Sequence, residues 1–293
     1  TFSYYATTEL RRFMLEGTSE QSVAVLPATI RASVLPSPDG RFLLVTTILE
    51  PFSYRFPVNR FAYRTEVHDA SGMKLATLVE KPVRDSIPIA FDATETGRRG
   101  FAWRDDASAT VFFAEAQDGG DPANEVPFRD HLFLLDAPFD GAARPFAKTR
   151  HRFQKVVWGE GGAAILTDFR WKDRNTKTYL ANADSSSTEP VAPKTLFDLS
   201  SENLYAQPGD FVTAPDSRGR QLLRRSADGR RLFLAGEGYS PEGNRPFLDA
   251  YELATGKTTR LWRADGKETY EPIVRVLDPE RGTLLTRVEG SKT

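Results

Sequence analysis

The residues of this chain that could support catalysis occur in patterns that argue against it. The three histidines, His68, His131 and His151, each lie in or beside a predicted strand, and none has the spacing of a metal-ligand motif. We therefore expect structural roles for the histidines, no metal site and no cofactor.

Ser240 has part of a hydrolase motif around it. It lies in Gly238-Tyr239-Ser240-Pro241-Glu242, which ends in Glu where a nucleophile elbow requires Gly. The residue after the nucleophile should donate its backbone N–H to the oxyanion, and Pro241 has no N–H. We predict that Ser240 is not a nucleophile and assign no catalytic residue to the chain.

The acidic motifs are equally weak. The run Asp118-Gly119-Gly120-Asp121 lacks the alternating oxygen ligands and distal Glu of a calcium loop, so we expect a tight turn there. Glu125 and Asp130 could in principle form a glycosidase pair, but a chain with 40 acidic residues contains such pairs by chance. A propeller glycosidase is the least favoured function.

Four arginines are the best candidates for binding a ligand. Arg55 and Arg60 lie in the aromatic and proline-rich insert 50–61, Arg129 ends the glycine-rich insert 117–130, and Arg245 follows the Ser240 turn. A guanidinium can bind a carboxylate with two hydrogen bonds. The alternative for each is a solvated or intramolecular ion pair.

A repeated pattern identifies the elements that carry these residues. Residues 37–45 and 65–78 recur as residues 227–234 and 248–261, in each copy with an Asp-Gly turn followed by apolar, β-rich strands and a second Gly turn. This is the pattern of a four-stranded propeller blade. Helical periodicity is sustained nowhere, with at most one turn at residues 201–205.

We predict an all-β fold, a β-propeller of four-stranded antiparallel blades with four complete blades and a half blade at each end. The strands expected in the complete blades are residues 30–35, 41–48, 64–69 and 74–79; 100–104, 109–115, 131–136 and 144–148; 153–158, 163–169, 176–182 and 194–198; and a fourth set within about 210–262, with an extra turn at 216–219. Residues 3–15 and 22–26 are expected as two outer strands, and residues 272–277 and 283–288 as two inner strands. We favour one partial propeller domain over residues 1–293, an excerpt of a larger propeller; the alternative is that the two ends pair into a fifth blade.

Composition excludes some partners. The 39 basic and 40 acidic residues leave a net charge of −1, which gives no long-range attraction to nucleic acid or to anionic membranes. No apolar run reaches the roughly 18 residues of a membrane-spanning helix. The absence of cysteine fits either an oxidising or a reducing compartment.

Several segments together resemble a known family. They are Phe52-Ser53-Tyr54 with Pro57, Ile87-Pro88-Ile89-Ala90-Phe91-Asp92, Trp103-Arg104-Asp105-Asp106-Ala107, Glu115 to Pro122, Glu125-Val126-Pro127 with Arg129-Asp130, Trp158-Gly159-Glu160-Gly161, and Ser240-Pro241-Glu242-Gly243 with Arg245 to Asp249. Across nearly the whole chain, these segments resemble the propeller of the glutamyl endopeptidase branch of the prolyl oligopeptidase (S9) family.

The resemblance implies a propeller followed by an α/β-hydrolase domain that carries a Ser-Asp-His triad and cleaves peptides after Glu. This chain contains no hydrolase sequence, so no triad residue is transferred to it, and we expect it to be inactive alone. The expected partners are a peptide substrate and the hydrolase domain of the parent protein, and an extracytoplasmic (periplasmic) or organellar location is expected for that parent. The rival interpretation is a free-standing propeller that binds a protein or glycan partner.

Overall fold

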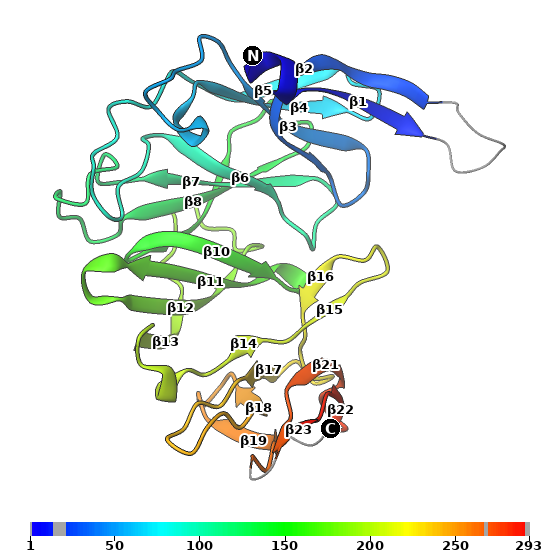
Figure 1. The fold of residues 1–293 in the computed structure, drawn as a ribbon, viewed down its shortest axis with the longest axis vertical. Helices are drawn as coiled ribbons and strands as arrows, with labels where there is room; N and C mark the ends of the chain where they lie inside the picture. Colours follow the sequence, from blue (N-terminus) through cyan, green and yellow to red (C-terminus); the bar gives the residue numbers. More distant parts are fainter. Residues whose placement is uncertain (1, 14–21, 267–268, 291–293) are drawn as a thin grey trace. The chain divides into compact units, whose positions relative to one another are not determined.

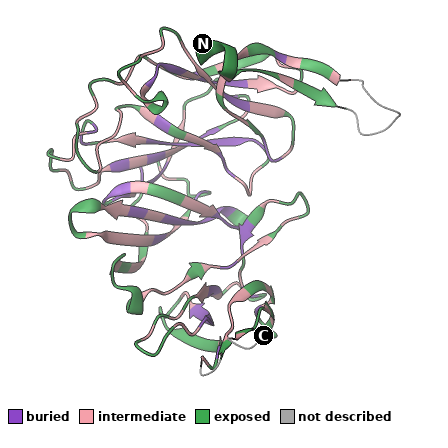
Figure 2. Ribbon diagram, in the orientation of Figure 1, coloured by how far each residue is buried: buried purple, intermediate pink, exposed green. Residues whose placement is uncertain are grey.

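The computed structural model describes residues 2–13, 22–266 and 269–290. It divides into two compact units, residues 1–150 with 185–192 (unit 1) and residues 151–184 with 193–293 (unit 2). Each unit is built from antiparallel sheets in which most neighbouring strands follow one another in the sequence (Figure 1). Figure 2 shows the buried residues concentrated on the strands.

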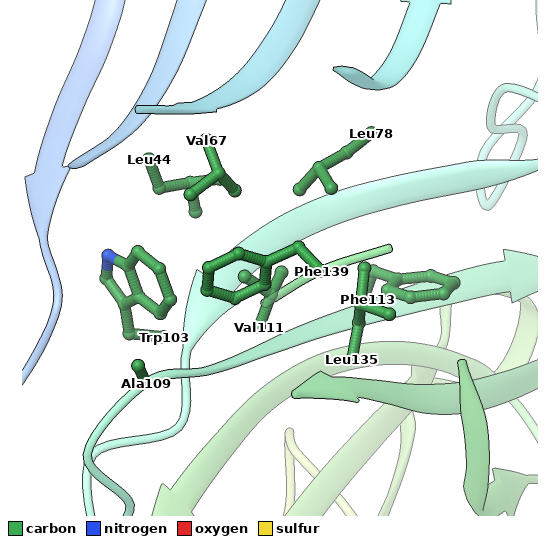
Figure 3. Packing of buried hydrophobic residues seen from close by; sticks show 9 residues of the cluster. All are labelled: Leu44, Val67, Leu78, Trp103, Ala109, Val111, Phe113, Leu135 and Phe139. Atoms are coloured by element: carbon green, nitrogen blue, oxygen red, sulfur yellow. The ribbon is translucent and has the colours of Figure 1, made fainter. Parts of the chain in front are cut away.

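Unit 1 contains two of these sheets. The first has the order β1 (Thr7–Phe13), β2 (Ser22–Pro36), β3 (Phe42–Ile48), β4 (Tyr63–Asp69) and β5 (Lys74–Lys81), and the second has the order β6 (Arg98–Trp103), β7 (Thr110–Ala116), β8 (Asp130–Asp136) and β9 (Arg144–Thr149). Leu44 and Val67 of the first sheet pack against Trp103 and Phe113 of the second (Figure 3). The indole N–H of Trp103 also donates to the Leu35 carbonyl at 2.8 Å, which joins the two sheets by a hydrogen bond.

Unit 2 repeats this arrangement. Its first sheet is β10 (Arg152–Trp158), β11 (Ala163–Arg170), β12 (Asn175–Asn182) and β13 (Lys194–Ser200), and its second is β14 (Asp210–Phe211), β17 (Arg231–Gly236), β18 (Phe247–Glu252) and β19 (Thr258–Arg263). Ile165 of the first sheet packs with Leu232, Leu234 and Tyr251 of the second. The described residues thus form four sheets of at least four strands, which confirms the predicted all-β fold of propeller blades.

Three strand pairs complete unit 2. The hairpin β15 (Thr213–Pro215) and β16 (Gln221–Leu223) encloses the predicted extra turn at 216–219. The hairpin β21 (Ile273–Asp278) and β22 (Thr283–Thr286) matches the two inner strands expected near the end, and β20 (Thr269–Tyr270) pairs with β23 (Glu289–Gly290). Ile273 and Val276 pack against the sheet that contains Phe233 and Leu248.

The repeated Asp-Gly turns explain why the same sequence builds the same hairpin twice. In the first copy the Ser37 hydroxyl donates to Asp39, and the Phe42 amide donates to the Ser37 hydroxyl oxygen. The second copy reproduces both bonds, from Ser226 to Asp228 and from the Arg231 amide to Ser226. The glycine between them has φ +73° in one copy and +70° in the other, a conformation that favours glycine.

The structure differs from expectation at the beginning of the chain. Residues 22–26 and 30–35 were expected in separate strands, but they form one strand, β2, whose first part pairs with β1 and whose last part pairs with β3. Pro27 lies where the β1 to β2 register shifts, because a proline has no N–H for the ladder. In place of the expected strand 3–15, the described residues form the short helix α1 (Phe2–Ala6) followed by β1, and residues 14 and 15 lie outside the described residues.

Helix is otherwise restricted to single turns in the described residues. These are η1 (Val58–Arg60), η2 (Glu160–Gly162), η3 (Trp171–Asp173) and η4 (Leu204–Ala206). No helix among the described residues has the length and apolar character needed to cross a bilayer.

Candidate functional site

The histidines make intramolecular contacts on the strands. Nδ1 of His68 lies 3.0 Å from the Gly72 carbonyl oxygen, and Nε2 of the buried His151 lies 2.9 Å from Oδ1 of Asn175. Burial lowers the pKa of His131 and of His151. No group of three or more potential metal ligands occurs in the part of the chain that the structure describes.

Ser240 lies in a turn stabilised by its own side chain. The Gly243 amide donates to the Ser240 carbonyl at 3.0 Å, and Pro241 occupies the second turn position, where its fixed φ is favourable. The Ser240 hydroxyl oxygen lies 2.7 Å from the Gly243 carbonyl oxygen and 3.1 Å from a carboxylate oxygen of Glu242. Its neighbours are hydrogen-bond acceptors of the same turn.

The glycine-rich insert is organised by Asp118, as a tight turn would be. Oδ1 of this buried side chain accepts the Gly120 amide at 2.9 Å, and Oδ2 accepts Nη1 of Arg129 at 2.6 Å. Arg129 also donates to the Pro122 carbonyl at 3.0 Å. The guanidinium of Arg129, which was predicted from the sequence to contact a ligand, thus binds two parts of its own loop, Asp118 and the Pro122 carbonyl.

The glycosidase pair has a similar intramolecular explanation. Asp130 is fully buried and lies 2.6 Å from Nη2 of Arg99, while Glu125 is exposed. A general acid needs access to its substrate, which the buried Asp130 lacks.

Arg60 connects two family-like segments of unit 1. Its Nη1 donates to the carbonyls of Arg84 at 3.3 Å and of Ile87 at 3.2 Å, which ties the aromatic insert to the segment that begins at Ile87. Arg55, in the same insert, is exposed, and its guanidinium makes no hydrogen bond or ion pair within the described residues.

A cavity of about 630 Å³ lies beside this insert in unit 1. Its apolar wall comes from α1, β2, β3, the insert and β6, through Phe2, Ile30, Ile48, Val58 and Phe101.

Polar side chains of this cavity have partners within unit 1. The Tyr63 hydroxyl donates to Glu95 at 2.9 Å, and burial together with the Glu95 charge raises the pKa of Tyr63. Arg84 lies 3.2 Å from the other Glu95 oxygen, and its guanidinium carbon is 4.6 Å from the centre of the Tyr63 ring. Arg31 donates to the carbonyls of Thr8 and Pro27. The cavity therefore suits an apolar group better than a charged one.

A pocket of about 460 Å³ lies in unit 2, lined by β13, the loop after it, β18 and β19. Its lining mixes apolar and polar side chains, and Arg260 of β19 stacks over the ring of Phe247 with its guanidinium carbon 4.3 Å from the ring centre. The same guanidinium is paired with Asp249 through two hydrogen bonds. Arg263, Tyr205 and Tyr239 complete the lining.

Arg245 adjoins this pocket through Gly238, one of its lining residues. The Arg245 amide donates to the Gly238 carbonyl at 3.0 Å. A Cβ added to Gly238, which has φ +61°, would lie 1.9 Å from the Arg245 carbonyl oxygen. The Arg245 Nε is buried, and its guanidinium has no hydrogen bond or ion pair among the described residues.

The structure therefore places the four predicted arginines in different roles. Arg55, Arg60 and Arg129 belong to unit 1 and Arg245 to unit 2. The guanidiniums of Arg60 and Arg129 have intramolecular partners, and those of Arg55 and Arg245 have none in the described residues. Sequence reasoning missed the lining residues Tyr205, Tyr239 and Arg263, for which the only signal was an aromatic or basic residue beside a loop.

Antiparallel four-stranded sheets with repeated Asp-Gly hairpins define a propeller-type fold in the described residues. No family model matches the chain. It is 32% identical over 281 residues to a probable chloroplastic glutamyl endopeptidase of Oryza sativa subsp. japonica, covering 94% of this chain and 29% of that protein. It is also 32% identical over 290 residues to the probable chloroplastic glutamyl endopeptidase of Arabidopsis thaliana, covering 97% of this chain and 30% of that protein.

Solved structures with similar folds share little sequence. An uncharacterised Listeria monocytogenes protein is 12% identical with a TM-score of 0.48, covering 97% of this chain and 77% of that one. Acylaminoacyl peptidase of Pyrococcus horikoshii is 12% identical with a TM-score of 0.42, covering 92% of this chain and 36% of that one.

The curated relatives confirm the resemblance found in the sequence: the chain is similar to glutamyl endopeptidases over nearly its whole length, and it folds as propeller blades. It spans less than a third of the length of the relatives it matches.

Proposed function

We propose that this chain is the non-catalytic propeller portion of a serine endopeptidase that cleaves after Glu, and that it gates or positions peptide substrates. The observation that carries the proposal is the similarity to glutamyl endopeptidases over 94% and 97% of the chain, in a fold that has no hydrolase sheet in its described residues.

Arg245 and Arg55 are the residues that we propose contact the substrate. Their guanidiniums have no intramolecular partner in the described part of the chain, so binding a carboxylate breaks no existing ion pair. Arg60 and Arg129 are positioning residues, because they hold the loops that carry the binding surface. A charge-assisted contact of this kind contributes about 1.5–3 kcal/mol.

The test measures kcat/KM of the full-length parent enzyme for paired Glu and Gln peptides. For Arg245→Gln and Arg55→Gln, we expect at least one variant to lower the value for the Glu peptide by roughly tenfold or more, with little change for the Gln peptide. The control is Arg218→Gln, which removes an exposed guanidinium in the turn between β15 and β16. An unchanged ratio of Glu to Gln cleavage in both variants would remove these arginines from the substrate site.

A further inference from the structure

The pocket of unit 2 contains one cation that the chain does not neutralise. Of its two arginines, Arg260 is paired with Asp249, the acidic residue of the lining. Arg263 is exposed, and it makes no hydrogen bond or ion pair within the described residues. The paired charges cancel, so Arg263 leaves the pocket with a net positive charge.

Two phenols face the same pocket. Tyr205 is 69% exposed and Tyr239 is 38% exposed, and neither hydroxyl makes a hydrogen bond in the part of the chain that the structure describes. The amide nitrogen of Gln207, in contrast, is already committed to the carbonyls of Ser200 and Asn203, at 3.0 and 3.1 Å. The donors available to a ligand thus include a guanidinium and two phenols.

Apolar side chains make up part of the same lining. They are Phe197 and Leu199 of β13, Phe247 of β18 and the exposed Leu204. Apolar side chains with a few polar groups, in a volume of about 460 Å³, are typical of a site for a small ligand or for one or two residues of a peptide. In the cavity of unit 1, in contrast, Tyr63 and Arg84 are both bound to Glu95.

We propose that the pocket lined by Arg263, Tyr205 and Tyr239 binds a carboxylate of a peptide. The guanidinium of Arg263 supplies bidentate hydrogen bonds, and the phenols donate to the same anion. The ligand's carbon chain packs against the apolar side chains of the lining. The site depends on the proposed function only for the peptide nature of its ligand, and it uses none of the arginines assigned there. The carboxylate could belong to an acidic side chain or to a peptide C-terminus.

Ligand-observed saturation-transfer NMR on the 293-residue chain tests this proposal with three probes. N-acetyl-glutamic acid α-amide carries a side-chain carboxylate, N-acetyl-alanine carries a terminal one, and N-acetyl-glutamine α-amide carries neither. We expect saturable binding of at least one carboxylate probe and much weaker binding of the glutamine probe. The stronger of the two carboxylate probes identifies the source.

The variants localise the binding. Arg263→Gln should lower the affinity for the carboxylate probe by roughly tenfold or more. Tyr205→Phe and Tyr239→Phe should lower that affinity less, and Arg263→Lys should retain part of it. Arg218→Gln removes another exposed charge of unit 2 and should bind as the unaltered chain does. Thermal unfolding of each variant checks that it folds.

Equal binding by the unaltered chain and a folded Arg263→Gln variant would overturn the proposal. So would a result in which neither carboxylate probe binds more tightly than the glutamine probe. Because no hydrolysis is measured, either result would leave the peptidase proposal untouched. That proposal fails separately, through the Glu to Gln ratio of the parent enzyme.

Discussion

Replacing Arg129 with alanine would leave the Asp118 carboxylate buried without its guanidinium partner. The two side chains meet at 2.6 Å, with the Asp118 side chain fully buried and that of Arg129 16% exposed. Arg129 also holds the Pro122 carbonyl, so the substitution releases both ends of the loop.

Breaking a buried pair from one side costs about 3–5 kcal/mol, because the remaining charge stays desolvated. We therefore expect Arg129→Ala to lower the free energy of unfolding by about that amount. Urea denaturation of the chain, followed by tryptophan fluorescence, measures the change. The double variant Asp118→Asn with Arg129→Ala removes the buried charge as well and should recover part of the loss.

The exposed Arg55 provides the matched control. Arg55→Ala should change the unfolding free energy by less than about 0.5 kcal/mol, as surface substitutions usually do. If Arg129→Ala were as harmless as Arg55→Ala, the buried ion pair would not stabilise this loop, and Arg129 would return as a candidate for substrate contact.

Two further outcomes follow from local geometry. In urea denaturation, Gly238→Ala should lower the free energy of unfolding more than Gly229→Ala. Both glycines have positive φ, but a Cβ added at position 238 would lie 1.9 Å from the Arg245 carbonyl oxygen, whereas one added at position 229 has nothing within 4 Å. Equal losses of stability would refute the close contact. The hydrogen bond from Tyr270 to Glu237 raises the pKa of Tyr270 to about 12. The hydrogen bond therefore stabilises the folded state fully below the pKa of an unfolded tyrosine, about 10, and this stabilisation is lost as pH rises through about 12. Phenolate absorbance should show a late-titrating tyrosine that disappears in Tyr270→Phe and titrates earlier in Glu237→Gln, and an unchanged titration in both would contradict the assignment.

The sheets could be predicted because their signals are local. The Asp39 and Asp228 turns each have a serine two residues before the aspartate and a glycine one residue after it. The residues that determine each hairpin turn are therefore all within a short stretch of sequence. The continuity of β2 could not be predicted in the same way. Pro27 signals a break, and the strand continues through it because the register of its partner β1 shifts there.

The pockets could be predicted much less well. Tyr63 meets Glu95 across 32 residues, and Arg60 meets Ile87 across 27, so no motif spacing indicates either contact. The insert arginines were proposed from the sequence as groups able to bind carboxylates, but the sequence could not show that Arg129 is paired with Asp118. Such partners are fixed by tertiary packing of the loops rather than by periodicity.

The claim that this chain is a non-catalytic propeller portion is tested most directly by the intact mass of the purified chain after treatment with a fluorophosphonate probe. The Ser240 hydroxyl lies in a turn followed by Pro241, which has no N–H to stabilise an oxyanion. We expect no covalent adduct and no cleavage of a Glu-containing peptide in the same sample. Stoichiometric labelling at Ser240 would contradict the account.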